Sequence, residues 1–296
     1  MININHVMDA PQVGGLVLLV LVVYIGASPR FGQELYRRRL FTDKEARPSQ
    51  PDLVEQFAWS KKRRVEISTD GGVKLNAWFF QSNEFSAGWR KDHLILYCIG
   101  RCSKVSNCLE EIKIFLESGY SVLITEYRGF GETPGNPSIE TICEDGLVAF
   151  DYAVEELKYS CENIVVFGES LGGGVAGYII RYRKPGALLL KNTFTSLKEI
   201  GSETVPLCRI YPRAMYPDNH LNTREAIRQW DGPLLVVHAV NDETIAFHHG
   251  VRLFETALQA KWRRFLDLPR SSHRFMLDPV DISAFVRELN HLTQAI

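Results

Sequence analysis

The chain lacks an excess of charge of either sign. Its 296 residues include 34 Lys and Arg against 35 Asp and Glu, which gives a formal net charge of -1. The sequence also has no stretch in which clustered basic residues alternate with aromatic residues. Because binding to nucleic acid depends on a concentrated positive surface, we expect no nucleic-acid partner.

Paired cysteines are also missing. The six cysteines form no Cys-x-x-Cys pair and no dense framework of the kind that gives small secreted domains their disulfides, so we expect reduced thiols. The first three lie close together in sequence, but no histidine is spaced to complete a zinc site with them, and no metal is expected there. The cysteines are Cys98, Cys102, Cys108, Cys143, Cys161 and Cys208.

Charge is absent from one long apolar run, residues 13–27. The run is short for a membrane span, which usually needs about 20 residues. Residues 1–12 lack the basic residues that begin a signal peptide, whereas Arg30 and Arg37-Arg38-Arg39 follow the run. This asymmetry favours a single-pass membrane anchor in residues 1–29, with the catalytic domain in the cytoplasm. The alternatives are a cleaved signal peptide, with export of the protein, and a buried helix.

Residues 30–63 are expected to form a basic juxtamembrane segment and a linker, in which Pro, Ser and Asp gather at 48–56. The rest of the chain, 64–296, alternates between strand and helix patterns. Two alternating segments around Asp70-Gly71-Gly72 predict an antiparallel hairpin, and apolar runs such as 94–100 are typical of parallel strands covered on both faces. We therefore predict one α/β domain with a doubly wound, mostly parallel sheet. Expected strands include 64–69, 73–80, 94–100, 121–125, 187–190, 233–240 and 265–269, and expected helices include 107–118, 138–159, 248–261 and 278–294.

The segment Gly168-Glu169-Ser170-Leu171-Gly172 lies between a β-branched run and a glycine-rich helix start. A Gly-x-Ser-x-Gly turn in this setting is typical of a nucleophile elbow, in which the serine Oγ projects above the strand end. Gly168 and Gly172 let the strand and the helix pass closely. The N–H of Leu171, in the first turn of the helix, is then directed at a developing oxyanion. Ser170 is therefore the predicted nucleophile.

The two strands that end the sheet are each followed by a residue that completes this chemistry. Asp242 follows the strand at 233–240, and His273 follows the strand at 265–269. Because the carboxyl ends of parallel strands meet at one edge of a sheet, we expect a Ser-Asp-His triad of Ser170, Asp242 and His273.

Other titratable residues near these strand ends offer alternatives. Glu243 is a second candidate acid, but it lies one residue further into the loop. His248 and His249 are expected to be solvated residues of a helix start rather than catalytic bases.

Five short motifs carry a resemblance to a known family: Tyr127-Arg-Gly-Phe-Gly, the elbow, Asn192-Thr-Phe-Thr-Ser, Asn241-Asp242 and Ser272-His273. With them, residues from about 65 to 295 resemble the α/β-hydrolase superfamily, most closely its compact membrane-anchored serine hydrolases with a small cap. The resemblance implies hydrolysis of an ester, thioester or amide through an acyl-serine intermediate, with no metal and no cofactor. Relatives include protein depalmitoylases, lipid and small-ester hydrolases and peptidases.

The loop after the strand at 94–100 departs from the family's pattern. Relatives usually have His-Gly-Asn-Ala-Gly, whereas this chain has Ile99-Gly100-Arg101-Cys102-Ser103. The resemblance implies that the second oxyanion donor is the main-chain N–H after the glycine, which Arg101 carries. The Arg101 side chain either favours an anionic substrate or points to solvent. The missing histidine leaves open a second hypothesis, a membrane-tethered interaction module without catalytic activity.

Residues 193–232 correspond to the cap over the acyl pocket in such relatives. Their aromatic residues, proline and methionine suit an apolar acyl group and equally suit ordinary packing. The expected partner is a small-molecule or lipid-like acyl substrate, or an acylated protein, and a serine peptidase remains an alternative.

Overall fold

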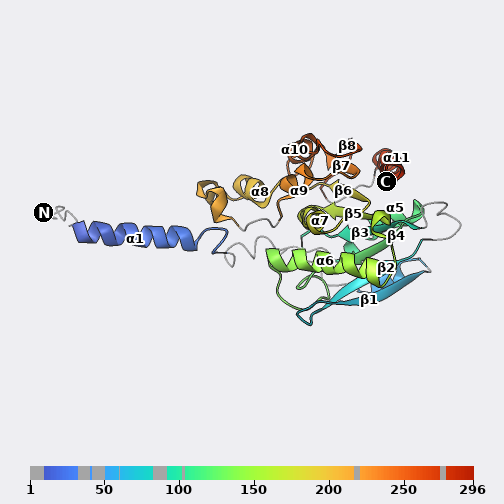
Figure 1. The fold of residues 1–296 in the computed structure, drawn as a ribbon, viewed down its shortest axis with the longest axis horizontal. Helices are drawn as coiled ribbons and strands as arrows, with labels where there is room; N and C mark the ends of the chain where they lie inside the picture. The colour runs from blue at the N-terminus through green and yellow to red at the C-terminus, as the bar shows by residue number, and fades with distance from the viewer. Residues whose placement is uncertain are drawn as a thin grey trace.

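The computed structural model describes residues 10–32, 41, 51–59, 61–82, 92–101, 104–216, 221–273 and 278–296. The described residues form an eight-stranded sheet with the order β1-β2-β4-β3-β5-β6-β7-β8 (Figure 1). β1 and β2 pair in an antiparallel hairpin, β2 runs antiparallel to β4, and the remaining pairs are parallel. The predicted α/β fold with its N-terminal hairpin is therefore confirmed. The strands are β1 (Lys62–Ser68), β2 (Lys74–Phe80), β3 (Leu94–Cys98), β4 (Ser121–Thr125), β5 (Ile164–Glu169), β6 (Ala187–Lys191), β7 (Leu234–Ala239) and β8 (Arg263–Leu268).

Helices cover both faces of the sheet, and two neighbouring residues of β5 show which helix lies on which face. Phe167 packs edge-on against Phe115 of α5, with 5.2 Å between ring centroids. At Gly168 a Cβ would lie 2.6 Å from the Cα of Gly173 in α7. Because successive strand residues point to opposite faces, α5 and α7 lie on opposite sides. The main helices are α5 (Leu109–Glu117), α6 (Ile139–Glu155), α7 (Leu171–Tyr182), α10 (His248–Thr256) and α11 (Pro279–Gln294).

Local sequence explains where two of these helices begin. Ser138 and Thr141 form a capping box at the start of α6, in which each side chain accepts a hydrogen bond from the other's main-chain N–H. Asp278 caps α11, and Pro279 occupies its first turn, where a missing N–H costs nothing.

α11 packs against α5 through Phe285 and Phe115, whose ring centroids are 5.9 Å apart.

Some predicted boundaries were wrong. The linker expected at 48–56 contains a short helix, α3 (Pro51–Gln56), whose Val54 is buried against the core. The helix expected to reach residue 261 ends at Thr256, because Ala257 leaves the helical conformation at φ -78° and ψ 55°. A 3-10 turn at Val105–Asn107 precedes α5.

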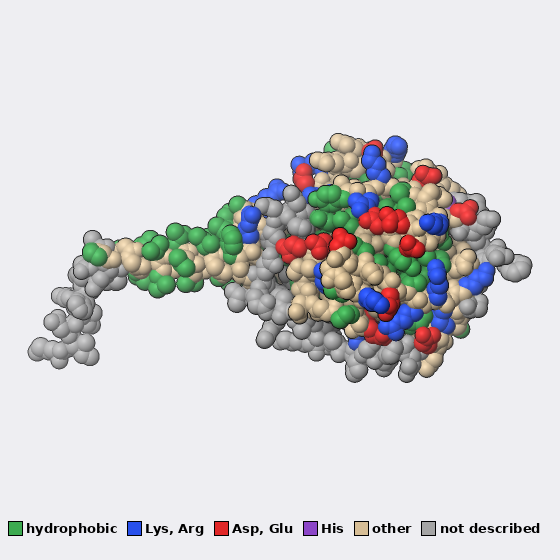
Figure 2. All heavy atoms as spheres, turned by 60° about the horizontal axis from the view of Figure 1, so that its bottom comes forward, with side chains coloured by type: hydrophobic (Ala, Val, Ile, Leu, Met, Phe, Trp, Pro, Cys, Tyr) green, Lys and Arg blue, Asp and Glu red, His purple; other side chains and the backbone are tan. Residues whose placement is uncertain are grey.

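The N-terminal helix α1 (Ala10–Gly26) projects from the body of the molecule (Figure 1). The apolar side chains of α1 are largely exposed, and Leu18, for example, is 63% exposed. They cover the helix in Figure 2, whereas the visible face of the body carries interspersed acidic and basic side chains. Among the residues with described positions, no helix has both the length and the apolar character needed to cross a membrane. The predicted single-pass anchor is not confirmed. The basic cluster Arg37-Arg38-Arg39 lies outside the described residues.

Candidate active site

The predicted elbow lies where β5 ends and α7 begins. Ser170 has φ 53° and ψ -119°, a backbone conformation that L-residues rarely adopt and that is typical of strained functional turns. The glycines on either side permit this turn. A Cβ at Gly172 would collide with the main-chain carbonyl of Cys98, and one at Gly168 would lie 2.6 Å from the carbonyl oxygen of Gly172. Strand, turn and helix therefore approach more closely here than any larger residue allows.

The structure brings Ser170, His273 and Asp242 into one hydrogen-bonded chain. Nε2 of His273 is 3.1 Å from Oγ of Ser170, and its Nδ1 is 2.7 Å from Oδ2 of Asp242. Ser170 follows β5, Asp242 follows β7 and His273 follows β8, so the three residues lie at the carboxyl ends of parallel strands, with β6 between β5 and β7. The alternative acid, Glu243, instead accepts a long hydrogen bond from the main-chain N–H of His273, at 3.4 Å.

Asp242 is held as a carboxylate. Its side chain is fully buried, and burial by itself raises a carboxyl pKa. The hydrogen bond and the charge of His273 oppose this effect, as do the main-chain N–H groups of Thr244 and Ile245, which both donate to Oδ1 over 2.8 Å. The net result is a pKa below the ordinary value of 3.8.

Ser170 opens onto a cavity of about 540 Å³. Most of its wall is apolar, with Phe194, Leu197 and Ile200 among the lining residues. The two predicted oxyanion donors, Leu171 and Arg101, also line it. Gly100 lies directly against the serine, because a Cβ added there would be 3.4 Å from the Cβ of Ser170. Arg101, the next residue, is exposed and borders the cavity. Cys102 and Ser103 lie outside the described residues.

Comparison with known proteins places this geometry in a family. A family model described as serine aminopeptidase, S33, matches residues 90–225, a span that contains the elbow. An uncharacterized protein of Mycobacterium tuberculosis is 30% identical over 226 residues, which cover 74% of this chain and 77% of the relative. The alpha/beta hydrolase domain-containing protein WAV2 of Arabidopsis thaliana is 25% identical over 240 residues, 76% of this chain and 74% of that protein. The chain belongs to the α/β-hydrolase superfamily.

Solved structures agree with this assignment at the level of the fold. An alpha-beta hydrolase from Vibrio vulnificus superposes with a TM-score of 0.69 at 17% identity, covering 89% of this chain and 93% of that one. The esterase Pf2001 of Pyrococcus furiosus gives a TM-score of 0.64 at 15% identity, with 81% of this chain and 92% of the esterase covered.

A buried ionic network lies beneath the elbow of this α/β hydrolase. Lys191, at the end of β6, is fully buried, and its Nζ lies 2.7 Å from Oε1 of Glu111 and 3.0 Å from Oε1 of Glu169. Tyr97 donates its hydroxyl proton to the other oxygen of Glu169 over 2.7 Å. Burial works to lower the pKa of Lys191, but the two carboxylates outweigh it and raise that pKa. No sequence pattern predicts this network, because its members come from four separate segments of the chain.

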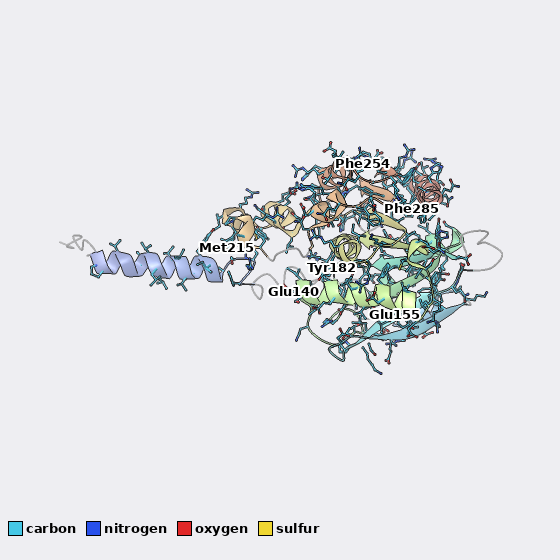
Figure 3. The ribbon with its side chains drawn as sticks, in the orientation of Figure 1. Glu140, Glu155, Tyr182, Met215, Phe254 and Phe285 are labelled. Atoms are coloured by element: carbon cyan, nitrogen blue, oxygen red, sulfur yellow. The ribbon has the colours of Figure 1, made fainter. Side chains whose placement is uncertain are left out.

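Among its described residues, the predicted cap region 193–232 contains α8 (Leu197–Thr204), two 3-10 turns at Pro206–Ile210 and Arg213–Met215, and α9 (Thr223–Arg228). The end of α1 packs on it, an unexpected contact. Tyr24 stacks on Tyr211 with 4.8 Å between ring centroids and donates its hydroxyl proton to the carbonyl of Ile210. The main-chain N–H of Arg30 donates to the carbonyl of Met215 over 2.8 Å, and Figure 3 shows Met215 beside this end of α1.

One prediction about this region of the α/β hydrolase was wrong. His249 was expected to be solvated, but it is fully buried, and its ring nitrogens contact Thr195 and Glu203. His248, its neighbour, is 42% exposed. Neither residue contacts the chain of Ser170, His273 and Asp242 through any hydrogen bond among the described residues.

Proposed function

We propose that this α/β hydrolase is a serine hydrolase that cleaves an ester, thioester or amide through an acyl-serine intermediate. The observation that carries the proposal is the continuous chain from Ser170 Oγ through the His273 imidazole to Asp242, with links of 3.1 Å and 2.7 Å. Both distances fall within the range that proton transfer requires.

In the proposed mechanism, Oγ of Ser170 attacks the acyl carbonyl carbon while its proton passes to Nε2 of His273. The buried Asp242 accepts the Nδ1–H hydrogen bond, which fixes the tautomer and stabilises the imidazolium. The main-chain N–H groups of Leu171 and Arg101 stabilise the tetrahedral oxyanion. His273 then gives its proton to the leaving group, and a water molecule, deprotonated by the same imidazole, releases the acyl group from Ser170.

The cavity supports an apolar acyl group as the substrate. Phe194, Leu197 and Ile200 line it beside Ser170, and such a wall stabilises hydrocarbon by removing it from water. A small lipid-like molecule and an acylated protein both fit this chemistry. The family model's description favours a second candidate, a serine aminopeptidase, which would cleave an amide with the same residues.

The N-terminal helix supports attachment of the protein to a membrane, with the catalytic domain on the cytoplasmic side as the flanking Arg30 predicts. An exported protein with a cleaved leader is the alternative. Deletion of residues 1–21 keeps Tyr24 and its contact with Tyr211. The shortened protein should no longer sediment with membranes at high salt, while the full chain does; equal sedimentation of both would refute attachment through this helix.

Labelling with a fluorophosphonate probe tests the proposed activity. The wild-type protein should be labelled and should hydrolyse members of a panel of acyl esters, acyl thioesters and aminoacyl amides. Ser170→Ala should abolish labelling and lower kcat by about 10⁶-fold while the protein stays folded. Ser283→Ala, at an exposed position of α11, is the matched control and should be labelled normally. A folded wild-type protein that resists the probe would favour the non-catalytic interaction module.

A further inference from the structure

Glu203, His248 and His249 form a cluster at the junction between the cap and the body. Glu203 belongs to α8 of the cap, and the two histidines begin α10 of the body. Nε2 of His248 lies 3.0 Å from Oε1 of Glu203, and Nε2 of His249 lies 3.0 Å from Oε2 of the same carboxylate. The two imidazole rings stack with 4.5 Å between their centroids. One potential ligand atom from each of the three side chains lies within 4.8 Å of the other two.

Hydrogen bonds to its second ring nitrogen orient the side chain of His249. Its Nδ1 lies 2.9 Å from Oγ1 of the buried Thr195, which in turn donates to Oε2 of Glu199 over 2.7 Å. The main-chain N–H of Thr195 also donates to the same nitrogen, over 3.3 Å. A metal ion at Nε2, the nitrogen that faces Glu203, would require the ring proton on Nδ1, from which Oγ1 of Thr195 can accept a hydrogen bond. Histidines that bind metals are usually oriented by such a relay to a carboxylate.

The charges around the cluster also suit a cation. Glu199 is paired with Arg224 and Arg252, at 2.9 Å and 3.4 Å, so its charge is already balanced. Glu203 has the two histidines as partners instead, each at 3.0 Å from one of its carboxylate oxygens. Imidazole nitrogens and carboxylate oxygens are ligands that Zn²⁺ prefers.

We propose that Glu203, His248 and His249 bind a divalent transition metal ion, with Zn²⁺ the best fit, across the junction between the cap and the body. Glu203 is 38% exposed and His248 is 42% exposed, which gives the ion a route from solvent and leaves room for water as a fourth ligand. The three ligands take no part in the proposed hydrolysis. Their position gives the ion a structural effect, because Ile200, Gly201 and Thr204 of the same helix line the cavity beside Ser170. A bound ion would hold α8, and with it this wall of the cavity, against α10.

Isothermal titration of the full chain with Zn²⁺ alone tests the proposal without any measurement of activity. The wild-type protein should bind one ion per chain. Glu203→Ala and His248→Ala should each weaken binding at least tenfold. These residues are partly exposed, so both variants are expected to fold, which a melting curve verifies. His291→Ala is the matched control, because His291 is a half-exposed histidine 3.3 Å from another glutamate, Glu288, and its removal should not change binding.

X-ray absorption of the loaded protein identifies the ligands. Nitrogen and oxygen ligands at about 2.0–2.2 Å are expected, whereas a Zn–S distance of about 2.3 Å would assign the ion to cysteine thiols instead. The proposal is overturned by sulfur ligation, by a wild-type protein that binds no Zn²⁺, or by binding that Glu203→Ala and His248→Ala leave unchanged. None of these outcomes depends on whether Ser170 is a nucleophile.

Discussion

The side-chain amide of Asn192 donates from Nδ2 to the main-chain carbonyl of His273 over 2.8 Å. Its Oδ1 accepts a hydrogen bond from the main-chain N–H of Ala239, the last residue of β7, also over 2.8 Å. Asn192 is fully buried and has a positive φ of 48°, a conformation that Asn tolerates better than most residues. One side chain therefore fixes the loop of His273 to the strand that precedes Asp242.

Asn192→Ala should release the loop of His273. A shift of about 1 Å at a reacting group lowers rates by about 10²-fold, so we expect a loss of that order in kcat with little change in KM. The unpaired N–H of Ala239 should lower the free energy of unfolding by about 1–3 kcal/mol. Steady-state kinetics and urea unfolding measure the two effects. The control is Asn241→Ala, because Asn241 is exposed and its Nδ2 donates a long hydrogen bond of 3.4 Å to the carbonyl of Pro269. Equal losses in the two variants would contradict the role of Asn192.

The contrast between Ser170 and Asn192 shows what the sequence can predict. Ser170, Asp242 and His273 follow strands that periodicity reveals, and parallel strands direct their carboxyl ends to one edge. Asn192 appeared in a recognisable motif, but its partners are main-chain groups, which no sequence pattern identifies. The burial of His249 escapes sequence analysis for a related reason. Two adjacent histidines at a helix start are typical of a solvated position, and the residues that surround His249, such as Thr195 and Glu203, are distant in the sequence.

Acidification should weaken the contribution of Asp242 to stability. Its pKa in the folded protein is lowered from 3.8, so the ionised form stabilises the fold fully above the unfolded pKa, and this stabilisation is lost as pH falls through the folded pKa. Asp242→Asn should therefore cost about 2 kcal/mol of unfolding free energy at pH 7 and less below about pH 4. Urea unfolding at several pH values measures the difference between the two proteins. If the difference in free energy of unfolding between the two proteins instead grew as the pH fell, the pKa of Asp242 would not be lowered in the folded protein.

Lys191→Met should destabilise the protein strongly. The change leaves the buried carboxylates of Glu111 and Glu169 without their cation, and removal of one partner from a buried ion pair costs about 3–5 kcal/mol. The exposed pair of Lys74 and Glu66, 2.9 Å apart, provides the control. Lys74→Met should change the free energy of unfolding far less, because solvent screens that pair. Urea unfolding compares the two variants, and similar losses would show that the buried network contributes no more than a surface contact.

The main chain of Arg101, rather than its side chain, is the proposed oxyanion donor, and two substitutions separate the roles. Arg101→Ala keeps the N–H and should leave kcat within a few-fold of the wild type. Arg101→Pro removes the N–H and should lower kcat by about 10²–10³-fold, the usual cost of one oxyanion donor. A melting curve must first show that the proline variant is folded, because the ring also restricts the loop beside Ser170.

The alanine variant carries further information, since the Arg101 side chain borders the cavity. If an anionic substrate pairs with the guanidinium, Arg101→Ala should raise KM for that substrate and leave KM for a neutral analogue unchanged. A proline variant with full kcat would remove Arg101 from the oxyanion hole. Equal losses of kcat in both variants would instead assign the effect to the side chain, because alanine preserves the main-chain donor that the mechanism requires.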